Sequence, residues 1–108
     1  MRIYLVHWNA DEAEQLAGDL RTQGHDVAVE AEDGARAAHR IFEDPPDAVV
    51  ISLRRLPSHG RDVAVHVRSR SDAPIIFVDG DPEKVDATAD AVPDAVHVSW
   101  DELSSQLR

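Results

Sequence analysis

The feature that most constrains the fold is a short apolar run, Ala48–Ile51, that ends abruptly at Ser52. Two prolines and an aspartate precede this run, and a loop containing Arg54 and Arg55 follows it. A continuous apolar run of this length is typical of a strand that is buried on both faces of a parallel sheet. In open sheets of that kind, chemistry takes place just beyond the carboxyl ends of the strands. Ser52 therefore stands where a reacting group is expected.

The same kind of pattern recurs along the whole chain. Strands are predicted at residues 2–7, 26–31, 48–52, 74–78 and 95–98, and amphipathic helices are predicted after Asn9, after Asp33, over residues 61–68, after Asp81 and after Ser99. Because strands and helices alternate with short connections, the sequence predicts a parallel sheet with right-handed crossovers and helices on both faces. In the second strand, Val27 and Val29 alternate with other residues, which predicts an edge strand.

Local signals mark where several helices begin and end. Asn9 stands three residues before Glu12, and Ser99 three residues before Glu102, so each pair predicts a capping box. Gly24 is expected to terminate the first helix.

Composition excludes several classes of function. The 108 residues are enough for one domain, 1–108, and they include no cysteine, which excludes disulfides and thiolate metal sites. The net charge of −10 argues against nucleic acid, whose phosphates need a basic surface. No apolar stretch approaches the roughly 18 residues of a membrane span, so a soluble, cytoplasmic protein is expected.

The charge is unevenly distributed. Within residues 54–70 the sign reverses, because Asp62 is outnumbered by Arg54, Arg55, Arg61, Arg68 and Arg70. One interpretation is an ordinary solvated helix face. The other is a basic docking surface that attracts an acidic partner.

In order and spacing, these segments resemble the receiver domain of two-component response regulators. The stretch EAEDGARAAHRIFEDPPDAVVIS resembles the second strand, second helix and third strand of that family, and PIIFVDG and VPDAVHVSW resemble its last two strands. LRRLPSHG resembles the loop that follows the phosphorylated aspartate. The resemblance implies a three-layer, flavodoxin-like α/β fold: a doubly wound parallel sheet of five strands in the order 2-1-3-4-5, with helices on both faces.

The resemblance also implies a set of working residues, and the chain departs from that set at each position. The family's magnesium-binding acidic pair corresponds to His7 and Trp8, its phosphoacceptor aspartate to Ser52, its Thr/Ser to Asp79, its Lys to Ser99, the proline after that Lys to Trp100, and its aromatic residue of the fifth strand to Val96. Aspartyl phosphorylation needs a carboxylate nucleophile and a magnesium ion held mainly by oxygen ligands. These substitutions therefore predict a degenerate phosphorylation pocket, a pseudo-receiver.

The leading hypothesis is a phosphorylation-independent signalling module that works through protein–protein contacts, without enzymatic activity and without a cofactor. Its partner would be another signalling protein, or a second copy of the chain in a homodimer. The candidate docking surface comprises Trp8, Arg54, Arg55, Arg61 and Trp100, since Trp and Arg dominate binding energy at interfaces. A simpler reading is that the two tryptophans only fill the vacated pocket.

Two alternatives remain open from the sequence. His7, His97 and Asp79 are residue types that bind zinc, and their convergence would make a small-ligand or metal-binding sensor at the strand ends. A minor hydrolase using Ser52, with His7 or His97 as base, is a third reading. It lacks the G-x-S-x-G turn of such enzymes.

Overall fold

The computed structural model describes residues 1–31, 34–52, 57–69, 71–78 and 94–107. Its strands are β1 (Arg2–Val6), β2 (Asp26–Glu30), β3 (Ala48–Ser52), β4 (Ile75–Val78) and β5 (Val96–Val98). Its helices are α1 (Ala10–Thr22), α2 (Gly34–Glu43), α3 (Pro57–Arg68) and α5 (Trp100–Gln106). The residue predicted to cap α2, Asp33, and the helix predicted after Asp81 lie outside the described residues.

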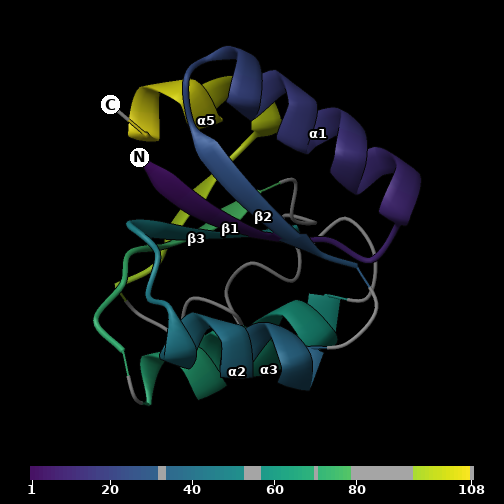
Figure 1. The fold of residues 1–108 in the computed structure, drawn as a ribbon. Helices are drawn as coiled ribbons and strands as arrows, with labels where there is room; N and C mark the ends of the chain where they lie inside the picture. The colour runs from purple at the N-terminus through teal and green to yellow at the C-terminus, as the bar shows by residue number, and fades with distance from the viewer. Residues whose placement is uncertain (32–33, 53–56, 70, 79–93, 108) are drawn as a thin grey trace.

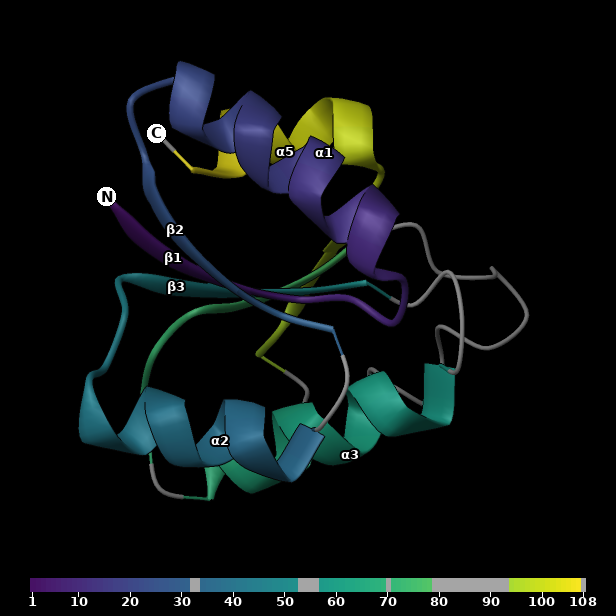
Figure 2. The ribbon, with the colours of Figure 1, turned by 45° about the vertical axis from the view of Figure 1, so that its right-hand side comes forward.

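The strands form one parallel sheet in the order β2-β1-β3-β4-β5, which confirms the predicted fold class and strand order. Helices α1 and α5 cover one face of this sheet, and α2 and α3 cover the other (Figures 1 and 2). β2 lies at one edge of the sheet, as its alternating pattern predicted, and β5 lies at the other.

Apolar side chains fill both spaces between sheet and helices. Alternate residues of β3 and β4 point to opposite faces, so Val49 and Phe77 join the α2–α3 layer while Val50 and Val78 join the α1 layer. Every residue of these two strands is buried. This explains why the two central strands read as uninterrupted apolar runs.

Several element boundaries differ from the sequence prediction. Helix α3 begins at Pro57, four residues before the predicted start at 61. Proline is favoured at a first helical position because its fixed φ suits the helix and its missing N–H would have no partner there. Gly24 has a φ of +95°, which confirms its role just after α1.

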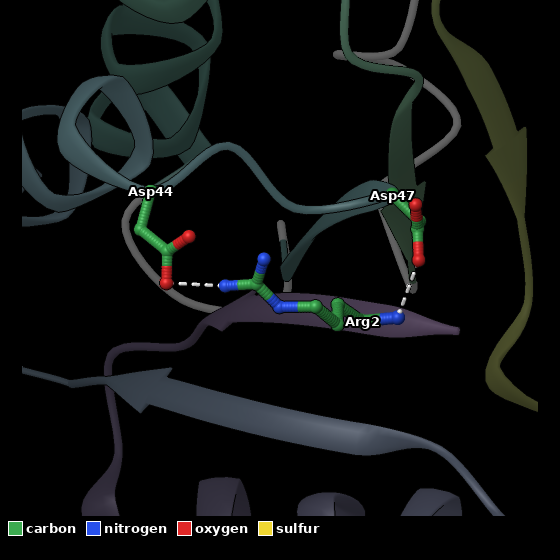
Figure 3. Close-up of polar contacts among 3 residues, drawn as sticks. All are labelled: Arg2, Asp44 and Asp47. Carbon is green, nitrogen blue, oxygen red and sulfur yellow. Dashed lines mark hydrogen bonds and ion pairs between the residues drawn. The ribbon is translucent and has the colours of Figure 1, made fainter.

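The start of the sheet is held by a contact between β1 and the residue before β3. The carboxylate of Asp47 accepts a hydrogen bond of 2.7 Å from the backbone N–H of Arg2, and the Asp47 backbone N–H donates to the Arg2 carbonyl at 2.8 Å. The Arg2 guanidinium extends the other way and pairs with Asp44 (Figure 3). Asp47 thus fixes where β1 and β3 begin to pair.

In the part of the chain that the structure describes, no helix is long and apolar enough to cross a lipid bilayer.

We predict that Asp47→Ala lowers the free energy of unfolding by about 1 kcal/mol, because it leaves the Arg2 N–H without its charged acceptor. Asp44→Ala is the matched control and should change stability less, since its ion pair with Arg2 lies on the surface. Urea unfolding of both variants measures the difference. Equal losses would show that the Asp47 contact does not anchor the strand.

Candidate functional site

The predicted site residues gather at the carboxyl edge of the sheet. His7 and Trp8 follow β1, Ser52 is the last residue of β3, and Ser99 and Trp100 follow β5. Since all strands are parallel, these ends lie along the same edge. Three of the predicted site residues, Asp79, Arg54 and Arg55, lie outside the described residues, and Arg61 is placed only as a position in α3.

His7 is almost completely buried, with 1% of its surface exposed. Its ring nitrogen Nδ1 accepts a hydrogen bond of 3.0 Å from the backbone N–H of Asn9. Its other ring nitrogen, Nε2, lies 3.4 Å from a carboxylate oxygen of Glu12. Because a backbone N–H can only donate, Nδ1 is unprotonated, and the neutral ring carries its proton on Nε2, facing Glu12.

These contacts alter the capping box predicted for α1. The Asn9 side chain does accept from the Glu12 backbone N–H, at 2.9 Å, which confirms half of the box. The other half, in which Glu12 would accept from the Asn9 backbone N–H, is supplied by the His7 imidazole. His7 therefore joins the end of β1 to the first turn of α1.

Sequence reasoning missed Glu30, a buried acidic residue whose backbone contacts that of His7. Glu30 is 5% exposed, and its backbone carbonyl accepts from the His7 N–H at 3.0 Å. Its side chain lies 3.7 Å from the Arg36 guanidinium. A signal was present in the sequence, because Glu30 ends the predicted edge strand and Arg36 lies in the first turn of the helix that follows. An ion pair between a strand end and a helix cannot be inferred from composition alone.

Ser52 is 2% exposed and lies between β1 and β4 at the end of β3, in register with Val78. The side chain is therefore enclosed by protein within the sheet, and its hydroxyl is not presented on an open surface.

The two tryptophans follow strands at the same edge but pack on opposite faces of the sheet. Trp8 is half-buried against the apolar cluster under α2 and α3. Trp100 is half-buried against the cluster under α1 and α5. Each indole thus closes one end of a core layer, and each leaves part of its surface at the rim.

Ser99 is exposed and precedes α5, but the second predicted capping box is wrong in its detail. The Ser99 side chain makes no capping bond to the helix backbone. Its hydroxyl donates instead to the Glu102 carboxylate at 2.9 Å, since that acid in the first turn offers a charged acceptor.

His97 lies on β5, far from His7. Its ring stacks on Phe77, with centroids 4.9 Å apart, on the face covered by α2 and α3. β3 and β4 separate β5 from β1, so three strand spacings place the two histidines about 14 Å apart. They do not share an ion, and among the described residues no cluster of three or more metal-binding side chains occurs.

Comparison with known proteins identifies the class of this fold. The receiver TrrA of Thermotoga maritima, solved with Mg(2+)-BeF, superposes with a TM-score of 0.80 at 26% identity over 98% of this chain and 95% of that one. The activated receiver domain of Klebsiella pneumoniae RstA gives 0.82 at 21% identity, covering 100% of this chain and 96% of that one. The chain thus has the receiver-domain fold of two-component signalling proteins.

Sequence relatives agree with this structural class. The DNA-binding response regulators MtrA of Mycobacterium tuberculosis and Mycobacterium leprae are 35% identical over 85 residues, 79% of this chain. This chain spans 37% of their length. No protein-family profile matches the chain.

We predict that His97 makes folding sensitive to mild acid. Burial lowers the pKa of His97 below its ordinary 6.5, so the unfolded chain binds a proton more readily than the folded one. The stabilisation is fully present above pH 6.5 and is lost as pH falls from there through the lowered pKa. Urea unfolding from pH 5 to pH 8 should show it.

His97→Phe keeps an aromatic ring against Phe77 and removes the titration, so its unfolding free energy should fall less on the acid side. His39→Gln, on an exposed face of α2, is the control. If the curves of wild type and His97→Phe run parallel, the histidine does not cause the acid sensitivity.

Proposed function

We propose that this chain is a receiver-like signalling module that acts through protein–protein contacts and without phosphorylation. The observation that carries the proposal is how the two ring nitrogens of His7 are bonded. The resemblance to receivers assigns this position to the magnesium-binding acidic pair, and here both ring nitrogens face groups in the first turn of α1. A neutral imidazole used in this way offers no lone pair to a metal ion.

The chemistry of the neighbouring positions supports the same conclusion. Phosphoryl transfer to a receiver needs a carboxylate nucleophile together with a divalent cation that neutralises the transferred charge. Ser52, at the aligned position, has a neutral hydroxyl, and it is 2% exposed. The Glu12 carboxylate lies close to the His7 ring, and the Glu30 carboxylate lies close to Arg36. The proposal therefore assigns the chain no catalytic step and no cofactor.

The partner in this proposal is another signalling protein, met in the cytoplasm, with a homodimer as the second form. One solved relative is the complex of the histidine kinase ThkA with TrrA, which matches this chain with a TM-score of 0.80 at 25% identity. The MtrA relatives are described as DNA-binding. For these 108 residues we propose no nucleic-acid contact, because their net charge is −10.

The proposed docking surface is the rim of the carboxyl edge with the start of α3. It comprises Trp8, Arg54, Arg55, Arg61 and Trp100. Support comes from Trp8 and Trp100. Both follow strands that end at the same edge of the sheet, and each is half-buried. Tryptophan and arginine are the residue types that most often dominate the binding energy of an interface.

We predict that beryllofluoride with Mg²⁺, or acetyl phosphate with Mg²⁺, leaves the amide NMR shifts of residues 7–9 and 52 unchanged. TrrA, which has been solved with Mg(2+)-BeF, is the positive control under the same conditions. A saturable set of shifts around Ser52 would refute phosphorylation independence.

We predict that the double substitution Arg54→Glu with Arg55→Glu removes binding to a partner identified by cross-linking from the source cells. Reversing two charges at the rim converts attraction into repulsion for an acidic partner. The control is Arg2→Glu with Arg21→Glu, which makes the same charge change on β1 and α1, where both arginines pair with exposed carboxylates, and it should leave binding intact. If only the control pair weakens binding, the interface lies on a different surface.

A further inference from the structure

The outer edge of β2 has unused hydrogen-bonding groups whose direction follows from the sheet. The Asp26 N–H donates to the Met1 carbonyl, and the Glu30 carbonyl accepts from His7, so both residues direct their backbone groups toward β1. Backbone groups of successive strand residues point in opposite directions. Val27 and Val29 therefore direct theirs outward, where no described strand pairs with β2.

An independent contact confirms this direction. The guanidinium of Arg21, near the end of α1, donates to the Val27 carbonyl at 2.9 Å. The same guanidinium lies 3.5 Å from the Glu14 carboxylate. The Arg21 side chain thus occupies one outward carbonyl of the edge, through a part-buried hydrogen bond and a surface ion pair with Glu14.

Two hollows flank this edge. The first, of about 340 Å³, is lined by residues that include Tyr4, Asp26, Ala28 and Arg40, and the second, of about 240 Å³, by residues that include Val29, Glu30 and Arg40. Both contain residues of β2 and share Arg40 of α2. Figures 1 and 2 show β2 at the side of the sheet, with α1 above it and α2 below it. A chain laid along β2 would pass both hollows.

We propose that the outer edge of β2 binds an extended peptide segment of a partner protein, which adds to the sheet as a sixth strand. Such strand addition gains affinity from backbone hydrogen bonds and specificity from alternate side chains. The surface includes none of the rim residues Trp8, Arg54, Arg55, Arg61 and Trp100. The inference therefore stands or falls separately from the docking surface proposed above.

Charge defines the chemistry of the peptide. On the α2 face, the exposed Asp26 and the buried Glu30, whose carboxylate lies 3.7 Å from Arg36, flank the exposed Ala28. A basic residue therefore fits best beside Asp26, a second one at the Glu30 end, and an acidic residue beside Ala28. That acid would meet the Arg40 guanidinium and the Tyr4 hydroxyl. The hydroxyl is buried and makes no hydrogen bond of normal geometry to a described residue. Burial raises the pKa of Tyr4, with Arg40 opposing the rise, so the phenol stays a donor at neutral pH.

The other face requires apolar residues. Val27 is buried, and Val29 is half-buried on the side of α1. Together the two faces specify a segment with the pattern basic–apolar–acidic–apolar–basic. This pattern reads the same in both directions, so it fits β2 in parallel or antiparallel orientation.

The test is an NMR titration of the intact chain with the acetylated, amidated peptide Lys-Val-Glu-Val-Lys. We expect saturable shifts at residues 26–31 and 40. The charge-swapped peptide Glu-Val-Lys-Val-Glu should bind about tenfold more weakly or worse, as expected when favourable charge pairs become repulsive. Arg21→Ala should strengthen binding, because it frees the Val27 carbonyl, and Arg21→Lys should not.

Two further variants separate strand addition from simple charge attraction. Val29→Pro removes an outward N–H while leaving the bonds to β1 intact, and it should weaken binding about tenfold or more in a protein with an unchanged circular dichroism spectrum. Two N-methylated peptides are compared, one modified at both valine amides and one at the central Glu amide. Only one of them should lose binding, because only one set of amides faces β2. Which peptide loses binding shows whether the added strand is antiparallel or parallel.

Equal affinity for the two charge patterns, or binding that survives both N-methylated peptides, would overturn the proposal. A concentration-dependent dimer in sedimentation that Val29→Pro dissociates would also overturn it, because the occupant of the edge would then be a second copy.

Discussion

The structure depends on the burial of β3 and β4 between two layers of helices. Both strands are buried on each face, so every one of their apolar side chains contributes to one of the two apolar clusters. Burial of apolar side chains is the main favourable term in folding, at about 1.5–3 kcal/mol for each fully buried Val, Ile or Phe. The neighbouring strands take their positions from this pair, and the carboxyl edge where the site residues meet is fixed as a result.

The sequence was sufficient for the architecture because the information is local. Runs such as Ala48–Ile51 specify buried strands, and periodic apolar residues specify helices, so the strand order followed once the resemblance was recognised. Asn9 and Gly24 were assigned correctly because each acts within a few residues of its own position. The start of α3 was placed too late, since Pro57 fits a first helical turn as readily as a loop.

The site was less predictable because its contacts join elements that are distant in sequence or compete with local ones. His7 was assigned to a pocket by position, yet it completes the cap of α1. Glu30 was overlooked because its burial depends on Arg36 and on pairing with β1. The alternative in which His7 and His97 converge fails for a topological reason, since β3 and β4 lie between β1 and β5. Residue types alone do not reveal which strands become neighbours.

The His7 contacts also limit how this protein can change over generations. A carboxylate introduced at position 7 would still accept from the Asn9 N–H, but it would place a second negative charge beside Glu12 in a buried setting. One substitution would therefore weaken the fold before it provided anything for a cation to bind. A carboxylate at position 7 would therefore require a compensating change at Glu12, whose own carboxylate lies against the Nε2 ring nitrogen of His7.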